Sequence, residues 1–108
     1  MIFDIVIVGA GPAGLALACG FANTKLKVAL IEKLSKKILT NPAIDGREIA
    51  ITHHSANILK KIDVWRYIPN QLISIIKEAK IMDGRSKYSL DFKHQDINKD
   101  SLGYLIPN

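Results

Sequence analysis

Three glycines and one acid near the start of the chain have a spacing that suits the binding of a diphosphate. Gly9, Gly11 and Gly14 follow a run of β-branched residues at positions 5–8. Where a strand ends in such a turn and a helix begins, the first N–H groups of the helix are free to bind an anion. Glu32 lies 18 positions after Gly14, where a carboxylate accepts hydrogen bonds from ribose hydroxyls. This spacing predicts a site for a dinucleotide.

Each residue of the turn has a separate physical role in this prediction. Gly9 ends the strand where the chain turns sharply, which suits a residue without a Cβ atom. Gly11 allows the backbone to approach the diphosphate, and Gly14 allows the helix to pack closely on the strand. Pro12 suits the first helical turn because the N–H that it lacks would be unpaired there. Chance packing of a glycine-rich turn is the alternative without a ligand.

The elements that position these residues follow from the hydrophobic pattern. The β-branched run at residues 5–8 precedes an Ala- and Leu-rich run at residues 15–19, and a second apolar run occupies residues 28–31. This order predicts a strand, a helix and a strand, which form the βαβ unit of a Rossmann-like α/β fold. Glu32 would repel a 2′-phosphate, so the pattern favours FAD or NAD over NADP.

An uncharged stretch at residues 5–24 is long enough to be considered as a membrane span. The residues before it include Asp4 but no Lys or Arg, so the positive region of a signal peptide is missing. Glycines and Pro12 also interrupt the stretch, and its β-branched residues precede its Ala and Leu residues. We therefore expect a cytoplasmic protein.

The composition restricts the class of protein further. At 108 residues and 48% hydrophobic content, the chain forms one domain at most. The net charge of +5 comes mostly from dispersed lysines, which indicates a solvated surface and no nucleic-acid partner, and leaves open a weak attraction to an anionic membrane surface. Cys19 lies among apolar residues and is expected to be buried and inert. The histidines lack the spacing of metal ligands.

Arg47 is a further candidate for contact with a phosphate. It follows a long polar segment with turn signals, residues 33–46, which we expect to be a loop. Loops of this length are often functional, and a planar guanidinium suits phosphate or polyol oxygens. The alternative for Arg47 is a surface ion pair with Asp45 or Glu48.

The residues after Arg47 predict a second helix. It follows a short apolar stretch at residues 47–51 and is capped by Thr52 or Ser55. His53 and His54 are expected at the surface of its first turn, with no acid–base partner. The apolar positions at helical spacing are Ala56, Leu59, Ile62 and Trp65.

The last third of the chain predicts a β-hairpin. Residues 72–83 and 87–92 are the two strands, joined by a turn at residues 83–86, although a short helix near residues 72–76 is an alternative. The hairpin has no further element to pack against, and a doubly wound nucleotide-binding domain needs more strands than these. We therefore expect an incomplete domain.

Together these stretches resemble the opening part of flavoprotein monooxygenases, specifically the ubiquinone-biosynthesis hydroxylases. The glycine motif is shared with many FAD enzymes, whereas the stretch at residues 45–51, Trp65 and the closing stretch are more specific. The matching stretches are residues 4–18, 28–33, 45–51, 55–59, 63–65 and 102–108.

The resemblance implies roles for individual residues. The turn, with Ala13, would surround the diphosphate of FAD, and Glu32 would hold the adenosine ribose. Lys33 would lie beside the adenine end, and Arg47 would reach FAD near its diphosphate and ribitol. No residue is identified as catalytic. The expected cofactor-binding residues are Gly9, Gly11, Pro12, Ala13, Gly14, Glu32, Lys33 and Arg47.

The resemblance also implies a function for the full-length enzyme. Such enzymes use FAD, O₂ and NAD(P)H to hydroxylate the aromatic ring of a polyprenylated quinone precursor, and association with the inner membrane surface or a biosynthetic complex is compatible with that substrate. Residues 1–108 would be the N-terminal part of the FAD-binding domain, and residues 72–92 a hairpin of the substrate-domain sheet.

A second flavin-binding motif of the family, a Gly-Asp stretch, does not occur in this sequence. We therefore expect the chain to be inactive by itself. The alternatives are a non-catalytic product of a truncated or interrupted gene and part of an NAD-dependent dehydrogenase.

Overall fold

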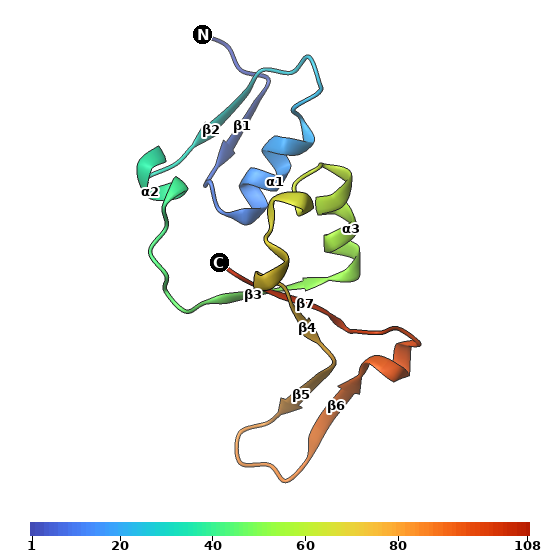
Figure 1. The fold of residues 1–108 in the computed structure, drawn as a ribbon. Coiled ribbons are helices and arrows are strands. Elements are labelled where there is room, and N and C mark those ends of the chain that lie inside the picture. Colours follow the sequence, from blue (N-terminus) through green and yellow to red (C-terminus); the bar gives the residue numbers. More distant parts are fainter.

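The computed structural model describes residues 1–108 as three small sheets and three α-helices along an elongated body (Figure 1). Its extents are 58 × 29 × 26 Å, and its radius of gyration is 17.5 Å. A compact domain of this length has a radius of gyration of about 13 Å. The elongation arises because the βαβ unit lies at one end, a three-stranded sheet at the centre and a hairpin at the other end.

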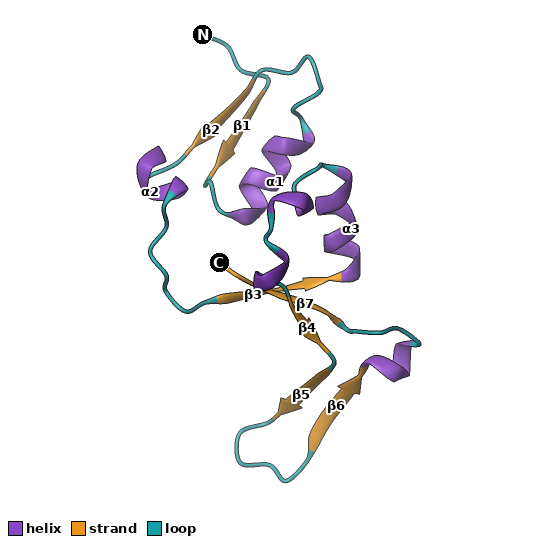
Figure 2. Ribbon diagram, viewed as in Figure 1, coloured by secondary structure: helices purple, strands orange, loops and turns teal.

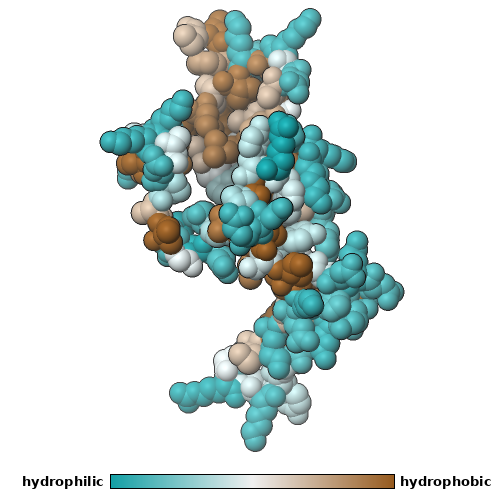
Figure 3. All heavy atoms as spheres, viewed as in Figure 1, coloured by the Kyte–Doolittle hydropathy of each residue, from teal (hydrophilic) through white to brown (hydrophobic).

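The βαβ unit forms as predicted. Strands β1 (Ile5–Val8) and β2 (Val28–Ile31) pair in parallel, with Ile5 opposite Val28 and Val8 opposite Ile31. Helix α1 (Pro12–Gly20) connects them and packs on one face of the pair (Figure 2). Ile7 and Ala10 are buried under this helix, whereas Val6 and Val8 are exposed on the opposite face. Hydrophobic atoms accordingly gather over this end of the molecule (Figure 3).

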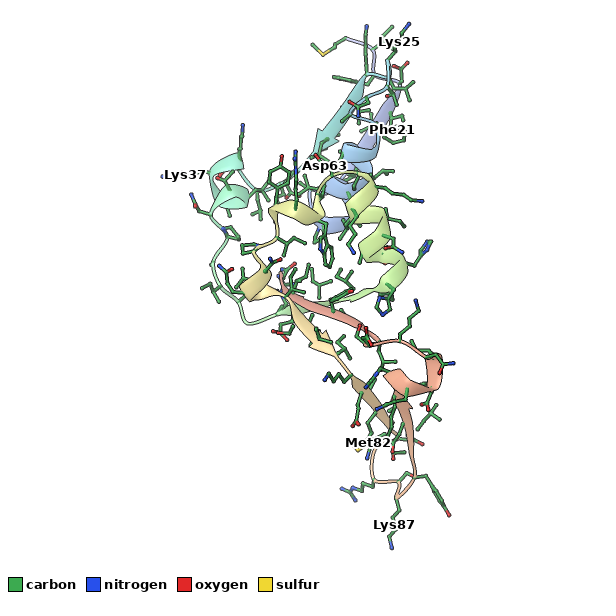
Figure 4. All side chains as sticks on the ribbon, turned by 45° about the vertical axis from the view of Figure 1, so that its right-hand side comes forward. Phe21, Lys25, Lys37, Asp63, Met82 and Lys87 are labelled. Carbon is green, nitrogen blue, oxygen red and sulfur yellow. The ribbon has the colours of Figure 1, made fainter.

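A short helix, α2 (Lys36–Thr40), lies within the segment predicted to be a loop. The carbonyl oxygen of Ser35 accepts hydrogen bonds from the N–H groups of Ile38 at 3.0 Å and Leu39 at 3.1 Å. Five residues are too few to show a helical period, and lysines occupy the first two of them. Lys37 points away from the body of the molecule (Figure 4).

The central sheet brings the end of the chain back to its middle. Strand β7 (Gly103–Pro107) lies between β3 (Glu48–Thr52) and β4 (Ser74–Ile76) and is antiparallel to both. The close approach of β7 to β3 needs a glycine, because a Cβ on Gly103 would lie 2.5 Å from the carbonyl oxygen of Ile51.

Helix α3 (His53–Lys61) follows β3 directly. Thr52 is its N-cap, as one of the two predicted alternatives, and its hydroxyl accepts from the N–H of Ser55 at 3.1 Å. The helix ends at Lys61, so Ile62 and Trp65, which were predicted to continue its apolar spacing, lie beyond it. Two short 3₁₀ turns, η1 (Trp65–Tyr67) and η2 (Asn70–Leu72), continue the chain to β4.

The predicted hairpin is present with different bounds. Strands β5 (Glu78–Met82) and β6 (Ser89–Lys93) pair in antiparallel fashion and are exposed throughout. The expected single strand at residues 72–83 is wrong, because Ser74–Ile76 pairs with β7 instead. A 3₁₀ turn, η3 (His94–Ile97), returns the chain toward the central sheet.

Two side chains lie differently from their predictions. Cys19 is exposed, because α1 is apolar on all sides and only one side faces the sheet. His53 is half-buried: its Nε2 lies 2.8 Å from the carbonyl oxygen of Ser101, and its ring meets Tyr104 edge-on at 5.5 Å. The return of the chain to β7 covers this histidine, whereas His54 is exposed as expected.

No helix in the structure has the length and apolar character needed to cross a membrane. No group of three or more His, Cys, Asp or Glu side chains is arranged to hold a metal ion.

Candidate dinucleotide-binding cleft

The glycine turn between β1 and α1 contains two positions that the fold itself requires to be glycine. Gly9 has a φ of +100°, which disfavours residues with a Cβ. A Cβ on Gly14 would lie 2.0 Å from the carbonyl oxygen of Gly9, which backbone atoms cannot avoid without moving the helix. Both predicted roles, the sharp turn and the close packing of the helix, are therefore visible in the geometry.

Gly11 is different because neither the backbone nor the packing requires a glycine there. Its φ of −72° and ψ of 177° suit any residue. A Cβ added to it would meet no atom of the chain within 4 Å. The space in front of Gly11 is therefore open to a group from outside the chain.

The same turn presents unpaired donors. Gly11 is the N-cap of α1 and gives no side-chain cap, and the first turn of the helix carries no acid. The backbone N–H groups of Gly11, Ala13 and Gly14 donate to no acceptor of the chain. The positive end of the helix dipole points the same way as these N–H groups, so the site favours an anion.

Glu32 follows β2 and lies against this turn. Its Oε2 accepts from the N–H of Ala10 at 2.7 Å, and its Oε1 accepts from the N–H of Leu34 at 2.8 Å. These hydrogen bonds, that from Ala10 first, lower the pKa of Glu32 below its usual value. The carboxylate is therefore anionic near neutral pH, is fixed in orientation, and keeps lone pairs for further donors.

Arg47 precedes β3 and forms an ion pair with Asp45. Its Nη2 and Nε lie 2.6 and 2.7 Å from Oδ2 of Asp45, and its backbone N–H donates to Oδ1 at 2.9 Å. The ion pair raises the pKa of Arg47 and lowers that of Asp45. The surface ion pair named as the alternative for Arg47 is thus present, although it leaves part of the guanidinium free.

A cleft of about 370 Å³ joins the turn to this ion pair. Its size falls within the usual range of small-molecule sites. One side is the start of α1, and the opposite side is formed by α2 and the loop after it (Figure 1). The residues that line it are Ala10, Gly11, Pro12, Leu15, Leu34, Ile38, Leu39, Pro42, Ala43, Asp45, Arg47 and Asn108.

Residues 3–103 match the model of the pyridine nucleotide-disulphide oxidoreductases. The chain belongs to this family.

Individual relatives of this oxidoreductase chain are ubiquinone enzymes. The chain is 46% identical to the ubiquinone hydroxylase UbiM of Neisseria meningitidis, over 97% of the chain and 24% of that protein. It is 31% identical to the mitochondrial ubiquinone biosynthesis monooxygenase COQ6 of Dictyostelium discoideum, over 99% of the chain and 24% of that protein. It is 28% identical to the ubiquinone hydroxylase UbiL of Rhodospirillum rubrum, over 97% of the chain and 24% of that protein. The resemblance to ubiquinone-biosynthesis hydroxylases is confirmed, and the chain spans about a quarter of the length of these relatives.

The fold brings together most of the residues predicted for the site of this oxidoreductase. Gly11, Pro12 and Arg47 line the cleft, and Glu32 holds two of its wall residues by hydrogen bonds. Gly9, Ala13 and Gly14 belong to the turn beside the cleft but do not line it. Lys33 is separate from the site, because it is exposed, does not line the cleft and forms no side-chain hydrogen bond or ion pair.

The apolar wall of the cleft was not predicted. Ile38 and Leu39 belong to the short helix α2. Asn108 lies at the cleft because β7 pairs with β3. Ser35, three residues before Ile38 in a polar segment, is a local sign of a helix start there, because it is the N-cap of α2. Nothing local in the sequence places Asn108 beside Arg47.

Proposed function

We propose that this chain is the FAD-binding part of a monooxygenase that hydroxylates the aromatic ring of a polyprenylated quinone precursor. The observation that carries the proposal is Gly11: it is glycine where neither the backbone nor the packing requires one, and open space and unpaired N–H groups lie in front of it. A diphosphate fits that space chemically, because it is anionic and accepts several hydrogen bonds.

In this proposal the chain's own residues bind and orient the cofactor. Gly11, Ala13 and Gly14 donate backbone hydrogen bonds to the diphosphate, and Gly9 shapes the turn. Glu32 accepts from the adenosine ribose, and the fixed carboxylate supports that role.

Three further residues lie beside that core. Arg47 contacts the diphosphate and ribitol with its free N–H groups. Pro12 contributes to the wall of the cleft. Lys33 lies toward the adenine end.

Bound FAD supplies the oxygen chemistry, with NAD(P)H as the reductant, since the protein's own side chains cannot supply it. The cleft is open to solvent, because the Arg47 side chain is 73% exposed. We therefore propose that the chain by itself binds FAD without hydroxylating a substrate. Residues 1–108 then form the N-terminal part of the FAD-binding domain, and the hairpin predicted at residues 72–92, observed as β5 and β6, belongs to the substrate-domain sheet. Strands β5 and β6 are exposed throughout in this chain, which supports a position of the hairpin against other strands of a larger sheet.

The substrate class follows from the relatives, whose names describe ubiquinone hydroxylases and ubiquinone biosynthesis monooxygenases. A polyprenylated precursor partitions into membranes, so we propose that the protein works in the cytoplasm at the inner membrane surface or within a biosynthetic complex. The net charge of +5 supports a weak attraction to anionic lipid.

The test is a titration of the purified chain with FAD and with NAD, followed by quenching of flavin fluorescence and by calorimetry. We expect saturable FAD binding that NAD displaces poorly. A chain that binds NAD and not FAD would favour the second candidate, an NAD-dependent dehydrogenase, which Glu32 also permits. Oxygen uptake with NAD(P)H by the FAD-loaded chain would contradict the inactivity proposed for the chain alone.

A further inference from the structure

Asp45 holds Arg47 by three contacts on one side. One carboxylate oxygen accepts from both Nε and Nη2 of Arg47, and the other accepts from the Arg47 backbone N–H. The edge of the guanidinium formed by Nε is therefore occupied. Both N–H groups of Nη1 and one of Nη2 donate to no protein atom, and these groups form the end of the fork that binds a phosphate in a bidentate manner.

The pair formed by Asp45 and Arg47 lies beside the end of the central sheet. Asn108 donates its backbone N–H to the carbonyl oxygen of Arg47 at 3.0 Å, which extends the pairing of β7 with β3. After the contacts from Arg47, the Asn108 side chain also favours the charged form of Asp45. All three residues line the cleft that contains the glycine turn. The pairing of two strands distant in sequence thus places Asn108 beside Arg47 and its carboxylate partner.

From this arrangement we propose that Asp45 is a positioning residue that orients the guanidinium of Arg47 toward the diphosphate of FAD. The inference rests on the proposed function. An arginine that is free at this exposed position would sample many rotamers and would lose that freedom on binding. The carboxylate also brings a negative charge near an anionic ligand. Its charge is already engaged by Arg47 on three contacts, so we expect orientation to outweigh repulsion.

The experiment is a double-mutant cycle on FAD affinity. Asp45→Asn keeps an acceptor for the Arg47 backbone N–H but removes the charge, and we expect it to raise the Kd for FAD by about threefold; Asp45→Ala should raise it by about tenfold. Arg47→Ala should raise it by about 30-fold. Because Asp45 acts through Arg47, Asp45→Ala should add almost nothing in the Arg47→Ala background.

Matched controls separate this role from a general effect of charge or folding. Asp91→Asn breaks the exposed ion pair with Lys80 on the hairpin, and Arg66→Ala breaks the exposed ion pair with Asp63. Neither should change the Kd for FAD. Urea unfolding of each variant shows that the fold is retained, and Asp45→Asn serves where Asp45→Ala does not fold.

Each outcome decides the matter. Non-additive losses at Asp45 and Arg47 support the inference. Additive losses, an unchanged affinity in the Asp45 variants, or tighter FAD binding would overturn it while the proposed function stands, because the wild-type chain would still bind FAD. A wild-type chain that does not bind FAD would overturn the proposed function and this inference with it.

Discussion

Gly11 and Gly14 belong to one motif, yet the structure predicts opposite results when each is replaced by alanine. At Gly14, the new Cβ would lie 2.0 Å from a backbone oxygen, and we assign a cost of about 3 kcal/mol to this overlap. Alanine within a helix returns about 1 kcal/mol. The net loss in the free energy of unfolding is about 2 kcal/mol.

At Gly11 the methyl group meets no atom of the chain within 4 Å, and the backbone angles suit alanine. Alanine makes the unfolded chain less flexible, which raises the free energy of unfolding by about 0.7 kcal/mol. Alanine is also a poorer N-cap than glycine, which lowers it by about 0.5 kcal/mol. The free energy of unfolding should therefore stay within about 0.5 kcal/mol of the wild-type value. The methyl group would occupy the space of the diphosphate, and we expect the Kd for FAD to rise about 30-fold, or about 2 kcal/mol.

Urea unfolding followed by circular dichroism measures the first quantity, and flavin fluorescence quenching measures the second. Gly11→Ala should change only the affinity, whereas Gly14→Ala should change the stability. Gly20→Ala is a control, because a Cβ there also meets nothing within 4 Å and it lies at the far end of α1. If the wild-type chain binds FAD and Gly11→Ala binds it equally well, the diphosphate does not occupy the open space in front of Gly11.

Three further predictions concern stability, each measured by urea unfolding. Hydrogen bonds from Ala10 and then from Leu34 lower the pKa of Glu32 below its usual 4.5. The stabilisation that they give is present above about pH 4.5 and is lost as the pH falls through the lower folded-state pKa. Glu32→Gln should therefore reduce the dependence of stability on pH in acid. Thr52→Ala removes the side-chain acceptor of a first-turn N–H at 3.1 Å in α3 and should cost about 1 kcal/mol, whereas Thr52→Ser should cost less. Gly103→Ala would place a Cβ 2.5 Å from a backbone oxygen of β3 and should cost about 3 kcal/mol; wild-type stability would show that the two strands can separate without loss.

Local patterns in the sequence predicted the βαβ unit and the structural roles of Gly9 and Gly14. The β-branched run, the glycine turn and the Ala- and Leu-rich run each act on the backbone within a few residues, so no distant contact is needed to interpret them. The same holds for Thr52, which caps the helix that begins immediately after it.

The parts that were missed depend on contacts between distant residues. The split of the predicted strand at residues 72–83 follows from the pairing of β4 with β7, about 30 residues later. His53 is half-buried because Ser101 and Tyr104 return to it through the same strand. Cys19 was predicted to be buried from its apolar neighbours, but the chain covers only one side of its helix.

The open form of the cleft distinguishes two parts of the proposed function, the binding of a dinucleotide and the transfer of oxygen. One wall carries the glycine turn and its unpaired donors, the other carries the apolar side chains of α2, and Arg47 lies at the edge with a largely exposed side chain. Oxygen transfer to an aromatic ring requires a site from which water is excluded, and a cleft of this form does not exclude it. Binding a dinucleotide requires less, because fixed N–H groups and a fixed carboxylate recognise a diphosphate and a ribose even at a partly wet surface. In the proposed function, these residues therefore recognise and orient the cofactor, and surfaces that cover the cleft exclude water.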